Sequence, residues 1–375
     1  MLKLRRPGPK LETQNCIFAQ IYQPVLATHE QYMQRCFELA LSGAGHVAPN
    51  PMVGAVLVHN ERIIGEGSHQ QYGQAHAEVN CINSVKEEDR SLIPSSTLYV
   101  SLEPCAHFGK TPPCSDLIIE KKIPEVVIGC RDPFKQVNGK GIEKLQAAGV
   151  KVNLDVLEKE ALLLNKRFIT FHQQHRPYII LKWAETADGK IAQEDFSRLL
   201  ISNEFTNRLV HKWRSEEASI LVGTNTARCD DPALTNRLWT GAHPTRLVID
   251  MDLQLPQTLQ LLDKKNPTIV FNTIKHEEQQ NLLYYQVTNE VSIVHQVMNA
   301  LYQLKILSVL VEGGAKLLQS FIDEGIWDEI RLIRGNKTAG SGIPAPIISN
   351  AQWLERESID SDTIEYFMNP QTVIH

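Results

Sequence analysis

The sequence predicts an α/β protein made of two consecutive domains, and three observations support this. The chain has 375 residues, which is too long for one ordinary hydrophobic core. Apolar runs of strand length alternate with segments of helical periodicity along most of the chain. A polar, amphipathic stretch over residues 157–174 separates one alternating series from a second. We therefore expect two layered α/β domains that meet near residues 172–177.

The first series begins with a helix near Thr28. Thr28 and Gln31 fit a capping box, and apolar residues then recur at helical spacing up to Gly43. Strand and turn signals predict the elements that follow. They are a strand over 53–58, a polar turn at 59–61, a second strand ending at 65–67, a helix from about 77, a strand over 97–102, a helix after Pro113, a strand over 126–129, a helix over 142–148 and a strand over 150–154.

The second series has the same alternating character. Its predicted elements are strands over 178–182, 219–222, 246–249, 268–271 and 308–311, and a helix over 315–323. The start of the chain, residues 1–27, has the composition of a solvated, flexible tail. We therefore expect this tail, a first domain over residues 28–173 and a second domain over residues 174–375.

Composition excludes several classes of protein. Hydrophobic residues make up 42% and charged residues 22% of the chain, which is ordinary for a globular protein. The formal net charge of −5 argues against a nucleic-acid binder, which is usually basic. No apolar run approaches the roughly 20 residues of a membrane-spanning helix, and the start lacks the features of a signal peptide. The odd number of cysteines, seven, favours reduced thiols, so we expect a cytoplasmic protein.

The first half contains a candidate metal site. The stretch QAHAEVN places His76 two positions before Glu78, and SLEPCAHFGKTPPCSD places Cys105 and Cys114 each after a proline. One imidazole and two thiolates fill three positions of a tetrahedral Zn²⁺ and leave the fourth open for water. This is the signature of zinc deaminases, although these usually have two residues between the cysteines and here there are eight. His107 is an alternative third ligand; we favour Cys114, because the prolines before it favour a helix start.

Such a site implies hydrolytic deamination. Bound Zn²⁺ lowers the pKa of water toward ~7, so that a zinc-bound hydroxide can attack a ring carbon that carries an exocyclic amine. Glu78 would accept the water proton and deliver it to the ring nitrogen and to the leaving ammonia. In the alternative, Cys105 and Cys114 are small core hydrophobes and His76 is a surface residue.

These motifs resemble one family, the bifunctional deaminase–reductases of riboflavin biosynthesis. The resemblance is carried by PNPMVGAVLV, AHAEVN, LEPCAHFGKTPPC and RDP in the first half, and by LKWAETADGK, TNTARCDDPALTNR, RLVID and VEGGAKLL in the second. The gap of eight residues between the cysteines is this family's own form. The resemblance implies a cytidine-deaminase-like α/β/α sandwich followed by a dihydrofolate-reductase-like α/β domain, with Zn²⁺ and NADPH as cofactors.

The activity that this resemblance implies has two steps. The first is deamination of 2,5-diamino-6-ribosylamino-4(3H)-pyrimidinone 5′-phosphate, and the second is reduction of its ribosyl side chain to ribityl by NADPH. Carried over by motif, Asn50 and His69 would contact the deaminase substrate and Lys110 would hold its base or phosphate end. Without the resemblance, Asn50 fits a turn between prolines and Lys110 a solvated loop charge. Family members also often form homo-oligomers.

Without the resemblance, the sequence of the second half indicates its function only weakly. Asp230 and Asp231 could be an acid pair, a carboxylate pair for sugar hydroxyls or an Asp-Pro turn, of which the turn is commonest. Gly313 and Gly314 lie between a predicted strand and a predicted helix, where backbone N–H groups can approach a phosphate. The GxGxxG fingerprint is missing, so this is not a standard dinucleotide-binding motif.

The resemblance assigns residues of this half to two ligands. The NADPH site would be lined by Ala184, Leu200, Thr226, Asp230, Met251, Gly314, Ala315, Lys316, Leu317, Leu318, Gln319 and Ser320. The sugar-phosphate substrate would be contacted by Arg198, Arg214, Leu234, Arg237 and Glu312, and arginines suit this role because a guanidinium binds phosphate bidentately. The chain departs from the family at Leu200, where tryptophan is common, at Met251, where a small hydroxyl residue is common, and after Trp327.

Two other functions fit parts of the pattern. A nucleic-acid base deaminase would share the zinc chemistry, but it needs a basic, aromatic-lined groove for the flipped base. A zinc-stabilised sensor would bind a nucleotide without turnover, and Glu78 beside an open metal position argues against it. We therefore expect a small-molecule enzyme that acts on neither nucleic acid nor membrane.

Overall fold

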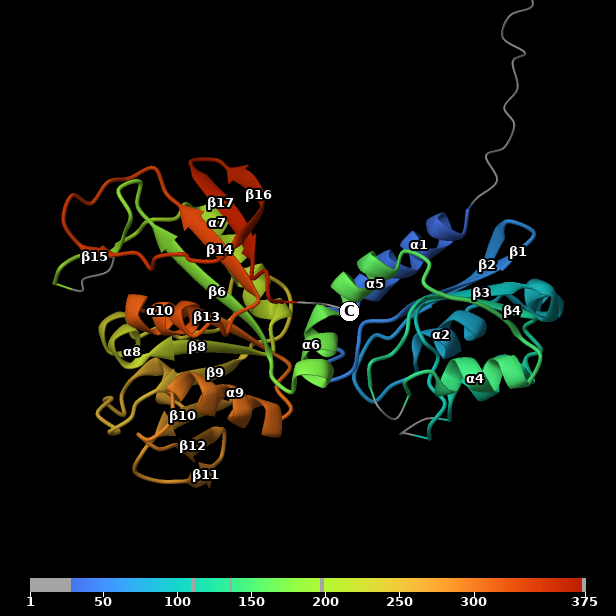
Figure 1. Ribbon diagram of the computed structural model, residues 1–375, viewed down its shortest axis with the longest axis horizontal. Helices are drawn as coiled ribbons and strands as arrows, with labels where there is room; N and C mark the ends of the chain where they lie inside the picture. Colours follow the sequence, from blue (N-terminus) through green and yellow to red (C-terminus); the bar gives the residue numbers. More distant parts are fainter. Residues whose placement is uncertain (1–27, 109–111, 135–136, 196–198, 373–375) are drawn as a thin grey trace, which may run out of the picture.

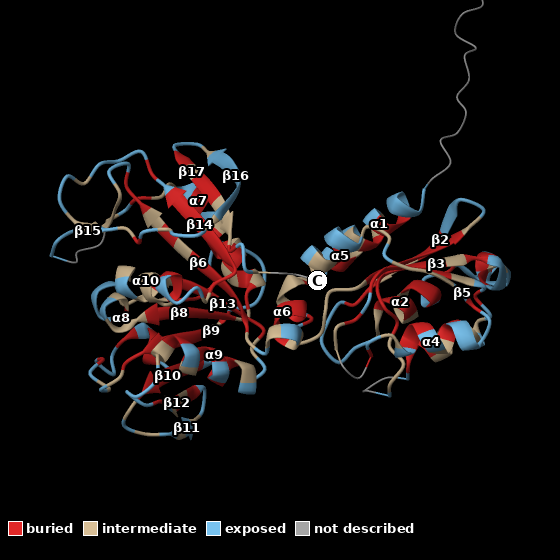
Figure 2. Ribbon diagram, viewed as in Figure 1, coloured by how far each residue is buried: buried red, intermediate tan, exposed pale blue. Residues whose placement is uncertain are grey.

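The computed structural model describes residues 28–108, 112–134, 137–195 and 199–372. Two α/β bodies lie side by side, each built around its own sheet, and helix α6 (Lys166–Gln174) lies between them (Figure 1). Buried residues are concentrated in the two sheets and on the helix faces that pack against them (Figure 2).

The first body is a three-layer α/β/α sandwich. Its sheet has the order β2-β1-β3-β4-β5, in which β1 is antiparallel to β2 and β3, while β3, β4 and β5 are parallel. The strands are β1 (Gly54–His59), β2 (Arg62–Ser68), β3 (Thr97–Leu102), β4 (Glu125–Cys130) and β5 (Lys151–Asn153). Helices α1 (His29–Leu41) and α5 (Glu158–Leu164) cover one face, and α2 (Ala77–Asn83), α3 (Cys114–Glu120) and α4 (Lys140–Ala147) cover the other.

Alternation along the strands explains this layering. In β1, Ala55 and Leu57 pack against the α2–α3–α4 face, whereas Val56 and Val58 pack beneath α1. Helix α1 begins where the capping box predicts, because the backbone N–H of Thr28 donates to Gln31 Oε1 at 2.9 Å.

The second body contains a sheet of ten strands. Its order is β11-β12-β10-β9-β8-β13-β6-β14-β17-β16, with a parallel core and antiparallel strands at both edges. The strands are β6 (Tyr178–Glu185), β8 (Ser219–Gly223), β9 (Thr245–Ile249), β10 (Thr268–Asn272), β11 (Glu277–Gln279), β12 (Leu282–Gln286), β13 (Ser308–Gly313), β14 (Glu329–Arg334), β16 (Gln352–Ile359) and β17 (Asp362–Met368). A separate two-stranded sheet joins β7 (Lys190–Ala192) and β15 (Ile343–Pro344).

Helices cover both faces of this sheet. Helices α9 (Ile293–Gln303) and α10 (Ala315–Asp323) pack on the largest hydrophobic cluster, which contains Leu181, Leu221 and Val311. Helices α7 (Glu204–Glu216) and α8 (Thr224–Asp230) pack on the opposite face. The family resemblance predicted this pair of folds, and the architecture agrees with it.

The strands and helices predicted in both series are present, but several elements of the second body escaped sequence analysis. Strand β14 is the clearest case, because it lies parallel to β6 inside the sheet although no strand was predicted there. Ile330 and Leu332 are buried on one face of the strand, but Glu329 and Arg331, which alternate with them, are buried too. Their ion pair hides two charges in the sheet and so conceals the hydrophobic pattern.

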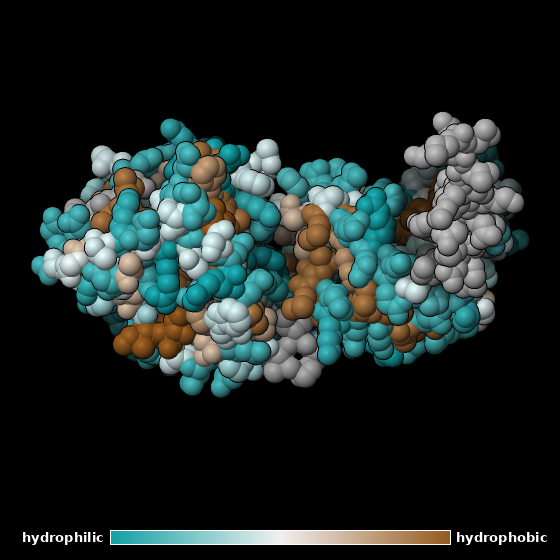
Figure 3. All heavy atoms as spheres, turned by 90° about the horizontal axis from the view of Figure 1, so that it is seen from above, coloured by the Kyte–Doolittle hydropathy of each residue, from teal (hydrophilic) through white to brown (hydrophobic). Residues whose placement is uncertain are grey.

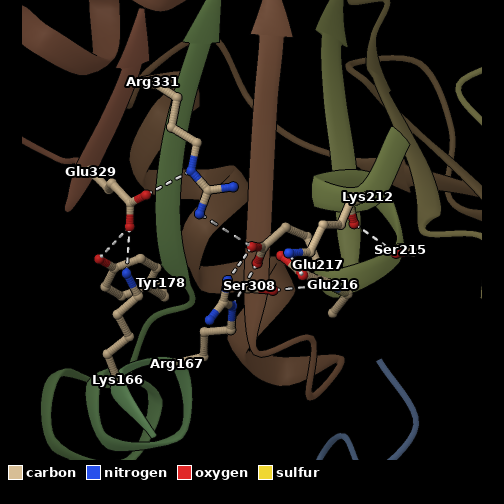
Figure 4. A network of polar contacts seen from close by, with 11 residues as sticks. Lys166, Arg167, Tyr178, Lys212, Ser215, Glu216, Glu217, Ser308, Glu329 and Arg331 are labelled. Atoms are coloured by element: carbon tan, nitrogen blue, oxygen red, sulfur yellow. Dashed lines mark hydrogen bonds and ion pairs between the residues drawn. The ribbon is translucent and has the colours of Figure 1, made fainter. Parts of the chain in front are cut away.

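A buried network of charged side chains attaches helix α6 to the second sheet (Figure 4). Arg167 donates hydrogen bonds from Nε and Nη2 to the two carboxylate oxygens of Glu217. Lys166 Nζ lies 2.5 Å from Glu329 Oε2. Arg331 lies between the two acids, with Nε 2.6 Å from Glu329 Oε1 and Nη2 3.9 Å from Glu217 Oε1. These contacts fix the orientation of α6 because every charge in the network has a partner of opposite sign.

The surface is mostly hydrophilic on the face seen in Figure 3, and a small band of hydrophobic residues lies where the two bodies meet. Among the helices of the described ranges, none combines the length and the apolar character that crossing a bilayer requires.

Candidate functional site

The predicted metal ligands come together at two helix starts. His76 immediately precedes α2, Cys114 is the first residue of α3, and Cys105 lies in the loop after β3. His76 Nδ1 lies 3.5 Å from Cys105 Sγ and 3.3 Å from Cys114 Sγ, and the three donor atoms all lie within 4.8 Å of one another. Ligand atoms around a tetrahedral Zn²⁺ lie roughly 3.3–3.8 Å apart, given metal–ligand bonds of about 2.0–2.3 Å. One nitrogen and two sulfurs therefore fit Zn²⁺ in both chemistry and size.

His107, the alternative third ligand, does not belong to this cluster. Within the described ranges, the group of residues able to hold a metal is formed by His76, Cys105 and Cys114. The ring of His107 instead faces Phe134 at a centroid distance of 6.2 Å. The geometry thus favours Cys114, as the prolines before it suggest.

Glu78 lies beside the cluster and is only 3% exposed. Burial raises the pKa of Glu78 to about 7, and the negative charge of Cys105 adds to this effect. A carboxyl group with a pKa near neutrality can both accept and release a proton. The hydrogen bond from the Cys114 thiol lowers the pKa of Cys105 to about 4 against the effect of burial, and His76 assists. Cys105 is therefore held as a thiolate, the form that binds metals.

A cavity of about 630 Å³ opens over this cluster and contains two of the predicted substrate residues, Asn50 and His69. His69 Nδ1 lies 3.0 Å from the carbonyl oxygen of Ala75, and its Nε2 lies 3.1 Å from Asn50 Nδ2. The carbonyl requires a proton on Nδ1, so Nε2 accepts from the Asn50 amide and the ring is neutral. Burial lowers the pKa of His69 in the same direction. Lys110 lies outside the described residues.

The second body completes the wall of this cavity. Tyr302, Lys305 and Leu307, from the end of α9 and the turn before β13, line it together with the metal ligands. Tyr302 packs on Phe171 of α6 at a ring centroid distance of 4.8 Å, which holds this segment at the junction. Sequence analysis missed these residues because they lie more than 180 positions from the metal ligands.

Two adjoining cavities of about 640 and 500 Å³ form the second site. Both lie at the carboxyl ends of the parallel strands β6, β8 and β13, where ligands of α/β sheets usually bind. They share five lining residues, Lys182, Asn207, Thr226, Asp230 and Glu312. The two cavities therefore adjoin at these residues.

The larger of these cavities has the features of a nucleotide site. Gly313 has a φ of 155°, and a Cβ atom on Gly314 would lie 3.2 Å from Thr226 Oγ1, so both positions favour glycine. Helix α10 begins directly after Gly314, which places its N-terminus at the cavity where a phosphate can bind backbone N–H groups.

Most of the predicted cofactor residues line this cavity. They are Ala184, Leu200, Thr226, Asp230, Gly314, Ala315, Lys316, Leu317, Leu318 and Ser320. Two predicted residues do not line it. Met251 packs on the main hydrophobic cluster, and Gln319 is bound to Ile347 and Asp323 on the outer side of α10. Sequence analysis missed Lys182 and Asn207, although Lys182 belongs to the motif LKWAETADGK.

The smaller cavity contains a cluster of charges and four of the predicted substrate residues. Arg214 binds Glu312 through Nε and Nη2, at 2.7 and 2.6 Å, and Lys182 Nζ lies 3.9 Å from the same carboxylate. Burial opposes ionisation of Glu312, but Arg214 and Lys182 lower its pKa to about 2. Leu234 and Arg237 line the same cavity, whereas Arg198 lies outside the described residues.

The two adjacent aspartates have different surroundings. Asp231 has a φ of 38° at the end of α8, and its Oδ1 accepts the backbone N–H of Gln260 at 2.7 Å. Its carboxylate therefore connects the end of α8 to the distant segment that begins at Gln260. Asp230 lines both cavities of the second site and is the member of the pair that can face a ligand in each.

Comparison with known proteins finds two family models that match separate parts of the chain. Residues 26–130 match the cytidine and deoxycytidylate deaminase zinc-binding region, and residues 177–359 match the RibD C-terminal domain. Riboflavin biosynthesis protein RibD of Aquifex aeolicus is 39% identical over 321 residues, which span 84% of this chain and 88% of the relative. The protein of the same name from Escherichia coli strain K12 is 32% identical over 331 residues, spanning 83% and 89%.

Solved structures agree over nearly the whole length. A diaminohydroxyphosphoribosylaminopyrimidine deaminase/5-amino-6-(5-phosphoribosylamino)uracil reductase from Thermotoga maritima has a TM-score of 0.84 and 36% identity, covering 91% of this chain and 98% of that structure. RibD from Acinetobacter baumannii has a TM-score of 0.83 and 29% identity, covering 92% and 99%.

The fold, the two sites and these matches define the class of protein, a zinc-dependent deaminase joined to an NADPH-dependent reductase. The chain belongs to the RibD family, the bifunctional deaminase–reductases of riboflavin biosynthesis. The resemblance found in the sequence motifs is thereby confirmed.

Proposed function

We propose that the chain deaminates 2,5-diamino-6-ribosylamino-4(3H)-pyrimidinone 5′-phosphate in the first body and reduces the ribosyl side chain of the product in the second. The observation that carries this proposal is the cluster of His76, Cys105 and Cys114 beside the buried Glu78, at the floor of a cavity. We assign deamination to residues 28–173 and reduction to residues 174–375. The second site supports reduction by offering adjoining cavities for a nucleotide and a sugar phosphate.

In the deaminase half, each residue of the cavity has a distinct task. A Zn²⁺ held by His76, Cys105 and Cys114 would supply a hydrolytic nucleophile at neutral pH. Glu78 takes up the proton that the attacking water loses and passes it to the ring nitrogen; it then takes up a second proton, from the new hydroxyl group on the substrate, and passes it to the departing amine. Asn50 and His69 orient the pyrimidine, because their mutual hydrogen bond fixes both side chains at the cavity wall.

In the reductase half, the chain mainly positions two ligands. NADPH supplies the hydride, and Gly314 and the first turn of α10 bind its phosphates through backbone N–H groups. Arg214 and Arg237 hold the sugar phosphate in the adjoining cavity. Lys182 and Asp230 lie where the cavities meet, so they can orient the ribosyl carbon toward the cofactor.

A split assay tests this proposal. The purified protein is given the diaminopyrimidinone ribosyl phosphate with and without NADPH, and ammonia release and NADPH oxidation are followed separately. Ammonia release without NADPH, followed by NADPH oxidation that depends on the deaminated product, is the expected result. Turnover of RNA or free cytidine in place of this substrate would favour a base deaminase and contradict the proposal.

Removal of the metal should abolish deamination alone. Three ligands converge on one position in the first body, and the described residues of the second site contain no such group. Dialysis against a chelator is expected to remove one zinc per chain, to stop ammonia release and to leave NADPH oxidation with added deaminated product intact. Zinc content by atomic emission and both assays are measured before and after zinc is restored. Loss of both activities together would contradict separate sites.

Substitution of Arg214 should cripple reduction. Arg214→Met removes a guanidinium that is 13% exposed and bound bidentately to Glu312. We expect kcat/KM for the deaminated product to fall about 30-fold or more, on the order of the smallest loss for truncating one partner of a buried, hydrogen-bonded charge pair. Arg208→Met on the exposed side of the same helix is the matched control and should behave as wild type. Equal kinetics of the two variants would rule out this role.

We also propose a cytoplasmic location and a homo-oligomeric state, with neither nucleic acid nor membrane as a partner. The charge of −5 and the cavities of small-molecule size argue against a nucleic-acid partner. Light scattering of the purified protein would determine the oligomeric state.

A further inference from the structure

His211 is a buried residue of the second site to which sequence analysis gave no role. It lies on α7, three positions before Arg214, so both side chains lie on one face of the helix. His211 is 6% exposed and lines the cavity that also contains Arg214 and Arg237. Burying a polar ring costs free energy unless its nitrogens are hydrogen-bonded.

A backbone contact determines the tautomer of this ring. The backbone N–H of Arg237 points at His211 Nδ1, and the N–N distance is 2.9 Å. Because an amide can only donate, Nδ1 must accept, and the single proton of the neutral ring lies on Nε2. Burial, together with the charges of Arg214 and Arg237, lowers the pKa of His211 to about 4, so the ring is neutral under physiological conditions.

The Nε2–H group thus remains as a fixed donor. Within the described part of the chain, Nε2 has no hydrogen-bond partner. It is also not fully buried, so a ligand in the cavity can reach it. The remaining groups of the cluster are arranged around the same space. Arg214 Nη1 lies 3.5 Å from the Thr235 carbonyl, and Arg237 Nη1 lies 3.2 Å from Thr235 Oγ1.

We propose that His211 binds the phosphate of the reductase substrate through Nε2–H while its Nδ1 anchors the backbone of Arg237. A neutral donor suits this place, because it adds a hydrogen bond to the anion without repelling the two neighbouring guanidinium groups. His211 is therefore a specificity-determining residue that recognises the phosphorylated substrate. This inference rests on the proposed reductase function.

Two variants separate the roles of the two ring nitrogens. His211→Asn keeps an acceptor near the position of Nδ1 and removes the donor, whereas His211→Gln keeps a donor near the position of Nε2. The probes are ribose 5-phosphate and ribose, and binding to each variant is measured by calorimetry. For His211→Asn we expect the Kd of ribose 5-phosphate to rise about 10- to 100-fold, the range for one hydrogen bond to a charged group, while binding of ribose is unchanged. His211→Gln should restore most of the lost affinity.

The kinetic counterpart uses the deaminated product, for which His211→Asn should raise KM with little change in kcat. His243→Asn, at an exposed histidine, is the matched control. The inference is overturned if His211→Asn binds ribose 5-phosphate as wild type does, if it weakens both probes equally, or if His211→Gln fails as badly as His211→Asn. It also fails if wild type binds ribose 5-phosphate no better than ribose. Binding that follows the expected pattern without NADPH oxidation would contradict the proposed reduction and leave the role of His211 intact.

Discussion

Glu78→Gln is expected to reduce deamination by about 10²- to 10⁴-fold, the usual contribution of one general acid–base residue. The amide is nearly the same size as the carboxyl group but cannot accept the proton that the nucleophile must lose. The zinc content should stay at the wild-type level, because the metal ligands are His76, Cys105 and Cys114 in the proposed site. The measurements are ammonia release under saturating substrate and zinc per chain.

The control for this variant is Glu88→Gln, at an exposed glutamate of the same body. Reduction provides an internal control as well, since NADPH oxidation with added deaminated product should be unchanged in Glu78→Gln. Wild-type ammonia release by Glu78→Gln would disprove the assigned proton transfer. Loss of zinc together with activity would instead make Glu78 a ligand.

Glu217→Gln is expected to lower the free energy of unfolding by about 3–5 kcal/mol, the cost of leaving a buried charge without its partner. The side chain of Glu217 is fully buried, binds Arg167 of α6 and lies 3.9 Å from Arg331. Its neutral replacement leaves the two arginines facing each other across the junction (Figure 4). Urea unfolding followed by tryptophan fluorescence suits the measurement, because Trp213 lies 4.8 Å from the Arg331 guanidinium.

Glu216→Gln provides a matched control one residue away. Its carboxylate is partly exposed and pairs with Lys212 at 3.8 Å, so we expect a change of about 0.5 kcal/mol or less. Equal effects of the two substitutions would contradict the importance of burial.

Acidification gives an independent check on Glu217. Burial opposes its ionisation, but Arg167 and Arg331 hold its pKa below the ordinary value of 4.5. A group with a lowered pKa in the folded state stabilises the fold fully above its unfolded pKa and loses that contribution as the pH falls through the folded value. The stability of wild type should therefore fall more steeply below pH 4.5 than that of Glu217→Gln.

Prediction from sequence succeeded where local patterns carry the information. The capping box at Thr28 and Gln31, the strand over 97–102 and the helix over 315–323 all depend on neighbouring residues, and all three are present. It failed at β14, where Glu329 and Arg331 interrupt the hydrophobic pattern; they pair with each other and also contact Lys166 and Glu217, which are far away in the chain. The lining of the metal cavity by Tyr302 and Leu307 could not be predicted for the same reason.

The residue assignments of the second site likewise succeeded for some residues and failed for others. Gly314 and Thr226 lie within the quoted motifs, and the structure places them next to each other at the cavity. Met251 was also assigned to this site, as the residue that follows the motif RLVID, but its partly buried side chain packs against the main hydrophobic cluster. Conversely, no motif singled out His211, whose role depends on a contact with the backbone of Arg237.

The sequence by itself determined the chemistry of this protein, because the kinds of side chain and their spacing fix which groups can bind zinc, carry a proton or bind a phosphate. The motif around His76 and Glu78 and the pair Cys105 and Cys114 were sufficient for that. Only the tertiary structure decided which nitrogen of His211 carries a proton, how α6 is held by buried charges, and that the second body completes the first cavity. Burial and the contacts between distant residues set these properties, and neither is a local property of the chain.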